Sequence, residues 1–356
     1  MSNIKRIQEK LIEKELDAFL VLSDVNQQYA TGFPATDGAV LVTKQEAYFF
    51  TDSRYIEAAT MAIKDAIVEV PPKGKTIRDR VRETVEKYGV KKLGIEENSM
   101  SVAAAESYGN LLAPVQLVPA QDIFGSLRAQ KTADELESLI AAQRIAEKAL
   151  ADVLTVIKPG MTEQELMAEL TYRMLKFGSE KNSFDPIVIT GTKTSMPHGV
   201  PGDVVIKEGD FITMDFGCTK NGYCSDMTRT VAVGYATDEM RKVYDTVLQA
   251  QLAGIAAAKA GVTGKDIDAA ARKVITDAGY GEYFGHSFGH SLGLEIHEAP
   301  NAAPSNDKPM PAGAVISAEP GIYIPGKFGV RIEDVIYLTE TGCVNITKAP
   351  KELIII

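Results

Sequence analysis

The stretch GHSFGHSLGLEIHEAP, residues 285–300, holds three of the four histidines of the chain, His286, His290 and His297, together with three glycines. The fourth, His198, stands between Pro197 and Gly199. Glycine permits close backbone approach around a site. A lone histidine is usually structural, but four histidines that all lie among acidic segments need a common cause. Residues 285–300 are therefore the centre of a candidate site.

Acidic residues interrupt four apolar runs around this stretch. Asp215 lies in FITMDF (211–216), Asp226 in GYCSDMTRTV (222–231), Glu319 at the end of AVISAE (314–319), and Glu333 in GVRIEDVI (329–336). An ionised carboxylate in an apolar interior must be protonated, paired or bound to metal. For one such residue, pairing with an arginine or with backbone N–H groups is the simpler explanation. Four carboxylates and four histidines together predict a metal centre.

Ligand chemistry narrows the kind of metal. Oxygen-dominated ligation with one imidazole suits manganese, and cobalt, iron and catalytic zinc are alternatives. Four carboxylates can neutralise two divalent cations, which predicts a two-metal site ~3.5–4 Å across that activates a bridging hydroxide and polarises a carbonyl. The residues alone thus indicate a hydrolase.

Further charged residues and two cysteines lie near these carboxylates in the sequence. Arg331 and Glu333 are two apart in an expected strand and should share one face, so Arg331 can orient that carboxylate, whereas a solvated arginine is the alternative. Asp334 faces the other way and is expected at the surface or behind the ligands. Cys218 and Cys224 lack a nearby base in the sequence, so a thiol nucleophile is disfavoured.

The length of 356 residues predicts two domains. Residues 1–126 alternate short β-rich runs with amphipathic helices, which predicts an α/β domain with strands at 18–22, 40–43, 47–50, 67–70, 92–95 and 115–118. A capping-box sequence at Thr132 to Glu135 then opens a long helix to about Ile157. Residues 127–356 read as an α+β domain, with strands at 211–216, 228–233, 314–318 and 330–338.

A weak internal repeat runs through the second domain. KPGMTEQEL (158–166) resembles KAGVTGKDI (259–267), and Gly178 and Gly279 keep the same offset of 101 residues. Because a glycine followed by a helix N-cap is common, chance is a rival explanation. We expect a duplicated unit with internal pseudo-symmetry.

The charge argues against some partners. The formal net charge is -10, from 38 basic and 48 acidic residues, so nucleic acid is not expected as a partner. No apolar run approaches the ~20 residues that span a bilayer, and the N-terminus lacks the apolar core of a signal peptide. Three cysteines give no disulfide pattern. These features predict a cytoplasmic protein without a membrane partner.

At these motifs the chain resembles the metallopeptidase family of aminopeptidase P, prolidase and methionine aminopeptidase, whose fold is called pita-bread. The resemblance implies metal ligands at Asp215, Asp226, His290, Glu319 and Glu333. The N-terminal half, with NQQYATGF (26–33) and LRAQKT (127–132), resembles the creatinase-type domain of the proline-directed members. The resemblance therefore implies a creatinase-type domain at 1–126, a pita-bread catalytic domain at 127–356, and a homodimer that hydrolyses Xaa-Pro bonds.

The family mechanism implies further roles. Glu319 would move a proton, and His286 and His297 would stabilise the tetrahedral species. His198 would contact the substrate or the leaving prolyl nitrogen, and Arg331 would support the ligands. Family dipeptidases often carry an arginine where this chain has Asn301, so we expect activity on peptides longer than Xaa-Pro as well as on dipeptides.

Two other functions fit the fold. A non-catalytic relative could bind peptides or proteins, although the intact ligand set argues against it. Another hydrolase or lyase could use the same scaffold. Substrates with and without proline at the second position would distinguish such an enzyme from an Xaa-Pro peptidase.

Overall fold

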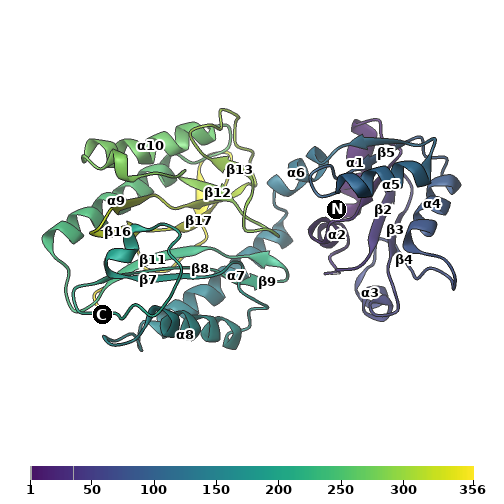
Figure 1. The fold of residues 1–356 in the computed structure, drawn as a ribbon. Coiled ribbons are helices and arrows are strands. Elements are labelled where there is room, and N and C mark those ends of the chain that lie inside the picture. Colours follow the sequence, from purple (N-terminus) through teal and green to yellow (C-terminus); the bar gives the residue numbers. More distant parts are fainter. Residues whose placement is uncertain (1, 35) are drawn as a thin grey trace. The chain divides into compact units, whose positions relative to one another are not determined.

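The computed structural model describes residues 2–34 and 36–356. The chain divides into two compact units, Met1–Arg128 and Ala129–Ile356 (Figure 1). The boundary expected from the sequence lies between residues 126 and 127. Within the described ranges, no helix is long and apolar enough to cross a membrane.

The first unit is built on one mixed sheet in the order β4-β3-β2-β1-β5-β6. Its strands are β1 (Ala18–Val21), β2 (Ala39–Thr43), β3 (Ala47–Phe50), β4 (Ile67–Glu69), β5 (Lys92–Ile95) and β6 (Gln116–Pro119). Its helices are α1 (Asn3–Glu13), α2 (Asp24–Thr31), α3 (Ile56–Ala62), α4 (Ile77–Lys87), α5 (Val102–Leu112) and α6 (Asp122–Ala129). The predicted α/β class and all six predicted strands are confirmed, with ends that differ by at most one residue.

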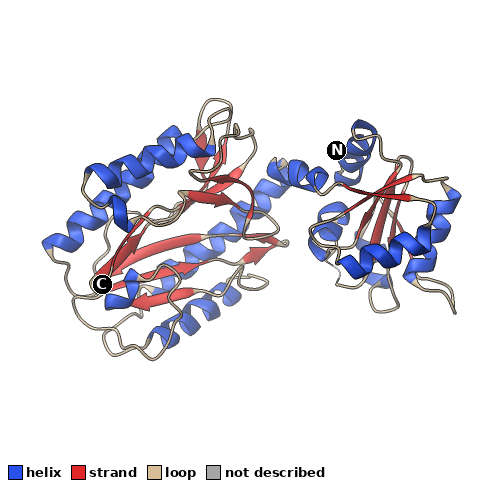
Figure 2. Ribbon diagram, turned by 45° about the horizontal axis from the view of Figure 1, so that its top comes forward, coloured by secondary structure: helices blue, strands red, loops and turns tan. Residues whose placement is uncertain are grey.

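The second unit places strands between two helix pairs (Figures 1 and 2). One pair is α7 (Ala133–Val153) and α8 (Glu163–Lys176), and the other is α9 (Asp238–Ala257) and α10 (Gly264–Asp277). Short 3-10 helices lie at η1 (Gly191–Ser195) and η2 (Gly281–Tyr283). The strands are β7 (Ile187–Thr190), β8 (Phe211–Phe216), β9 (Thr219–Lys220), β10 (Tyr223–Cys224), β11 (Met227–Ala232), β12 (Gly289–Ser291), β13 (Glu298–Ala302), β14 (Val315–Ala318), β15 (Gly321–Ile324), β16 (Phe328–Arg331), β17 (Asp334–Leu338) and β18 (Cys343–Asn345).

Two antiparallel sheets organise these strands. One has the order β11-β8-β7 and the other β13-β12-β14-β17-β18, while β15-β16 and β10-β9 form two-stranded ribbons. This arrangement is the predicted α+β catalytic fold.

The internal repeat is visible in the backbone. Helices α8 and α10 each have 14 residues and begin after a threonine N-cap, Thr162 or Thr263, whose hydroxyl accepts the N–H of the third helical residue. The glycines two residues before each cap also match, because Gly160 donates to the Ile206 carbonyl at 3.0 Å and Gly261 to the Met310 carbonyl at 2.9 Å. The predicted pseudo-symmetry is therefore confirmed.

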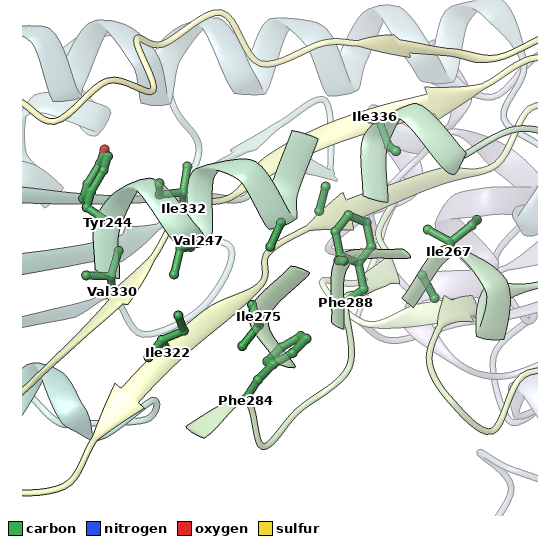
Figure 3. Packing of buried hydrophobic residues seen from close by; sticks show 14 of the residues in the cluster. Tyr244, Val247, Ile267, Ile275, Phe284, Phe288, Ile322, Val330, Ile332 and Ile336 are labelled. Carbon is green, nitrogen blue, oxygen red and sulfur yellow. The ribbon is translucent and has the colours of Figure 1, made fainter. Parts of the chain in front are cut away.

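The core beneath α9 and α10 supports the histidine-bearing stretch. Figure 3 shows Val247 and Ile267 of these helices with Phe284 and Phe288, which flank His286. Helix α9 approaches Phe288 so closely that a Cβ at Gly254 would lie 2.3 Å from its ring. Glycine is therefore needed at position 254, and the segment leading to His290 is held against a rigid helix.

The predicted strand at 330–338 is wrong in one respect, because it is two strands. β16 pairs with β15 and ends at Arg331, whereas β17 pairs with β14 and begins at Asp334. At the crossing, the Glu333 N–H donates to the Thr228 carbonyl at 3.1 Å, and the buried Gln251 amide donates to the Ile332 carbonyl at 3.3 Å. These bonds replace a ladder at the point where the chain changes sheets.

Candidate metal centre

Strand pairing brings the four carboxylates together in two pairs. Asp215 lies in β8 opposite Thr228 of β11, and Asp226 directly precedes β11. In the other sheet Glu319 directly follows β14, and Glu333 directly precedes the β17 strand that pairs with it. Each half of the unit thus presents two carboxylates at the same end of an antiparallel strand pair.

Ligand atoms from the two halves converge. Single atoms of Asp226, His290 and Glu333 all lie within 4.8 Å of one another. The His290 Nε2 is 3.5 Å from the Asp226 Oδ2 and 3.3 Å from the Glu319 Oε1. A cavity of about 440 Å³ is lined by these residues and by Asp215. All five residues expected to bind metal therefore face one cavity.

The orientation of His290 suits a metal ligand. Its Nδ1 lies 3.1 Å from the Ser291 carbonyl, which places the proton on Nδ1 and leaves a lone pair on Nε2. Burial lowers the pKa of His290, so the imidazole stays neutral. Its backbone N–H donates to the Ser317 hydroxyl at 2.9 Å, and that hydroxyl donates to the Glu319 Oε1 at 3.0 Å.

The electrostatics of the carboxylates fit divalent cations. Burial, followed by the charges of neighbouring carboxylates, raises the pKa values of Asp226 and Glu333 well above the ordinary range. Burial also raises the pKa of Glu319. The buried Oδ1 of Asp215 has no hydrogen-bond partner among the described residues. Carboxylates crowded in this way are stabilised in ionised form by cations, so the residues present fit a metal centre.

Arg331 ties the two halves together beneath the cavity. Its Nη2 donates to the Asp215 Oδ2 at 2.6 Å, and its Nε donates to the Thr228 hydroxyl at 3.0 Å. The Thr228 hydroxyl in turn donates to the Glu333 Oε2 at 2.7 Å. Arg331 is only 3% exposed. A solvated arginine, the alternative from the sequence, does not describe this side chain.

The other three histidines also line the cavity. His286 has both ring nitrogens engaged, because Nδ1 lies 2.9 Å from the Ser287 carbonyl and Nε2 lies 2.9 Å from the Tyr323 hydroxyl. His198 and His297 are exposed, and the His297 ring packs edge-on against His290 with centroids 4.4 Å apart. Burial lowers the pKa values of His286 and His297.

Asn301 and Asp334 lie outside the cavity lining. Asn301 is exposed in β13, directly opposite His290 in the β12–β13 ladder. Asp334 is fully buried rather than at the surface, and it binds Arg229 at 2.8 Å and Lys351 at 2.5 Å. Arg229 also donates to the Glu333 carbonyl at 2.6 Å, so Asp334 lies behind a candidate ligand.

Sequence reasoning missed several residues of the site. Phe184 and Ile296 give the cavity apolar walls, and Tyr323 accepts a hydrogen bond from the Arg331 Nη1 at 2.9 Å. Thr228 and Ser317, the hydroxyl partners of the carboxylates, do carry a signal. Each stands two residues from an acid beside an expected strand, Asp226 before 228–233 or Glu319 after 314–318, and this spacing places two side chains on one face of a strand.

Comparison with known proteins agrees with this geometry. The family described as Metallopeptidase family M24 matches residues 137–340, and the Creatinase/Prolidase N-terminal domain matches residues 3–130. The Xaa-Pro dipeptidase of Pyrococcus furiosus is 36% identical over 97% of this chain and 99% of its own.

Two solved structures are similar over nearly the whole chain. The Xaa-Pro dipeptidase from Bacillus anthracis matches with a TM-score of 0.95 and 42% identity, covering 99% of both chains. The X-Pro aminopeptidase from Thermotoga maritima matches with a TM-score of 0.94 and 37% identity, covering 98% of this chain and 99% of its own. The chain belongs to metallopeptidase family M24, with a creatinase/prolidase N-terminal domain and a pita-bread catalytic domain.

Proposed function

We propose that the protein is a metal-dependent peptidase that hydrolyses the bond before proline in Xaa-Pro substrates. The observation that carries this proposal is the convergence of four carboxylates and one imidazole on a single cavity. The names of the relatives, Xaa-Pro dipeptidase and X-Pro aminopeptidase, support proline at the second position of the substrate.

Five side chains would hold two divalent cations in this proposal: Asp215, Asp226, His290, Glu319 and Glu333. Manganese is our first choice because oxygen ligands dominate, and cobalt, iron and zinc are the alternatives. Cations held there would polarise the scissile carbonyl and lower the pKa of a water molecule. The partnerless Oδ1 of Asp215 and the raised pKa values of its neighbours support this assignment.

The remaining side chains divide the work on the substrate. Glu319 would accept a proton from the attacking water and deliver it to the prolyl nitrogen, which must be protonated to leave. His297 and His286 would stabilise the tetrahedral oxyanion. Because the Nδ1 proton of His286 faces the Ser287 carbonyl and its neutral Nε2 accepts from the Tyr323 hydroxyl, His286 would donate to an oxyanion only in its protonated form. His198, exposed at the cavity, would contact the substrate near the leaving nitrogen.

Arg331 would keep the ligand carboxylates in place rather than bind substrate. Three of its contacts, with Asp215, Thr228 and Tyr323, already engage the guanidinium. Asn301 offers no positive charge for the carboxylate of a dipeptide, so we propose that longer Xaa-Pro-Xaa peptides are also substrates.

Assembly and location complete the proposal. We infer a homodimer by analogy with the proline-directed members of the family. The net charge of -10 argues against nucleic acid as a partner. We propose a cytoplasmic location without a membrane partner, and the free thiols of Cys218, Cys224 and Cys343 are compatible with a reducing compartment.

A substrate panel tests the proposed function. The purified protein, loaded with Mn²⁺, is assayed on Leu-Pro, Leu-Pro-Ala, Leu-Ala and Leu-Ala-Ala. We expect cleavage of both proline peptides and at least tenfold slower turnover of the other two. Equal cleavage without proline would indicate another hydrolase, and binding without turnover would indicate the non-catalytic alternative.

A further inference from the structure

His297 occupies its position without a hydrogen bond to its ring. Within residues 2–34 and 36–356, no side chain or backbone group bonds the imidazole, which contacts the His290 ring and is exposed. It also lies in an irregular segment, residues 292–297, between β12 and β13. Apart from this contact with His290, the placement of the ring therefore depends on the backbone that carries it.

The next residue, Glu298, anchors that backbone. Its side chain is only 4% exposed, and its Oε1 accepts the Glu295 N–H at 3.1 Å, which closes the segment on itself. A Cβ at Gly293 would lie 2.7 Å from both carboxylate oxygens, so the carboxylate packs tightly inside the turn. Glu298 also pairs with Ser291 in the β12–β13 ladder, one residue from His290.

Lys131 holds this carboxylate from a distant part of the sequence. The Lys131 Nζ lies 3.0 Å from the Glu298 Oε2, and its side chain is 1% exposed. The Lys131 backbone N–H donates to the Gly313 carbonyl at 2.9 Å, just before β14, so the lysine itself is fixed. An ion pair buried to this degree is costly to break on one side only, which makes it a firm support.

We propose that the Lys131–Glu298 ion pair positions His297 for catalysis. This inference rests on the proposed function, and it makes Lys131 and Glu298 positioning residues that act through His297. If Lys131 is removed, the segment 293–298 should loosen and the imidazole should shift, while the metal ligands keep their own supports.

The kinetic test uses Lys131→Met in the wild type and in His297→Ala, with bound metal measured in each full-length enzyme. We expect kcat for Leu-Pro to fall about tenfold or more in the wild-type background, with KM within about twofold and metal content unchanged. In the His297→Ala background, the same change should lower kcat less than twofold. An equal loss in both backgrounds, or no loss in the wild type, would overturn the proposal.

A second variant and a second readout guard against misfolding and inactivity. The double variant Lys131→Met/Glu298→Gln removes both charges of this ion pair, so neither member keeps a buried charge that the other had balanced. It should show the same loss of kcat, and wild-type kcat would overturn the proposal.

Hydrogen exchange at the Glu295 amide should be about tenfold faster in Lys131→Met. Unchanged exchange would contradict the anchoring even if the wild type had no peptidase activity, a result that would separately refute the proposed function.

A matched control is Lys193→Met. Lys193 pairs with the buried Glu163 at 2.6 Å on the other half of the unit. Lys193→Met should change kcat by the same factor in the wild type and in His297→Ala. Hydrogen exchange at the Glu295 amide should stay at the wild-type rate. If the control behaves like Lys131→Met, the coupling to His297 is not specific and the proposal fails.

Discussion

The two halves of the catalytic unit share a scaffold and differ in the loops attached to it. In the half built on α7 and α8, Asp215 lies in β8 and Asp226 directly precedes β11. In the half built on α9 and α10, β14 and β17 flank Glu319 and Glu333, and the stretch 285–300 adds three histidines. The comparison teaches that the repeated backbone provides paired carboxylates, whereas three of the histidines lie in a stretch of the second half that is not part of the repeat.

Removing one carboxylate from each half should have the largest effect. Asp226→Asn and Glu333→Gln each delete an ionised ligand while keeping the size of the side chain, so both should lose bound metal and lower kcat by on the order of 10³-fold. Metal analysis and steady-state kinetics measure the two effects. A variant that keeps two metals and full turnover would show that its half does not contribute to the centre.

The histidines of the second half should separate into two classes. His297→Ala should lower kcat by about 10²-fold with metal content retained, because it removes a group that stabilises developing charge. His290→Ala should release metal, because its Nε2 points at Asp226 and Glu319. The opposite pattern, metal lost from His297→Ala and kept by His290→Ala, would reverse our assignment of the two residues.

Substrate length should respond to one position in the second half. Asn301→Arg would introduce a guanidinium opposite His290, and a charge-assisted bond to a dipeptide carboxylate is worth ~1.5–3 kcal/mol, or about 10- to 100-fold. We expect the ratio of kcat/KM for Leu-Pro over Leu-Pro-Ala to rise by about tenfold. A wild type that cleaves only dipeptides would mean that another cationic group already holds the carboxylate.

The smallest effect concerns the repeated helix caps. Thr162→Ala and Thr263→Ala each remove a hydroxyl that accepts a helix N–H, which should lower the free energy of unfolding by ~1 kcal/mol. Thr263→Ala should cost slightly more, because the Thr263 hydroxyl also donates to the Asp266 carboxylate at 2.7 Å, whereas the Thr162 backbone N–H that bonds Glu165 is kept in alanine. Urea denaturation of the metal-free variants measures both, and a cost confined to one cap would argue that the two helices are not equivalent.

The sequence predicted those features that are local. Asp215, Asp226, Glu319 and Glu333 stand out because each interrupts an apolar run, and the repeat is visible because Thr162 and Thr263 follow matching glycines. Strand ends came within one residue for the same reason, except in the predicted strand 330–338. These signals need only the residues on either side of them.

The features that escaped prediction depend on tertiary contacts. Apolar residues lie on both sides of Glu333 and Asp334, and the chain changes its strand partners there; the two acids alone do not distinguish one strand with a ligand from two strands in different sheets. Lys131 and Glu298 are 167 residues apart in the sequence. The bond between His286 and Tyr323 joins a loop to strand β15. Only the folded chain brings these partners together.

The central claim is that carboxylates of both halves build one two-metal centre on which turnover depends. Titration of chelator-stripped protein with Mn²⁺, followed by both metal binding and Leu-Pro hydrolysis, tests it most directly. We predict no turnover without metal and full turnover at two bound ions per chain, with binding lost in Asp226→Asn and in Glu333→Gln alike. Full hydrolysis by the metal-free protein, or a centre that survives both substitutions, would contradict the claim.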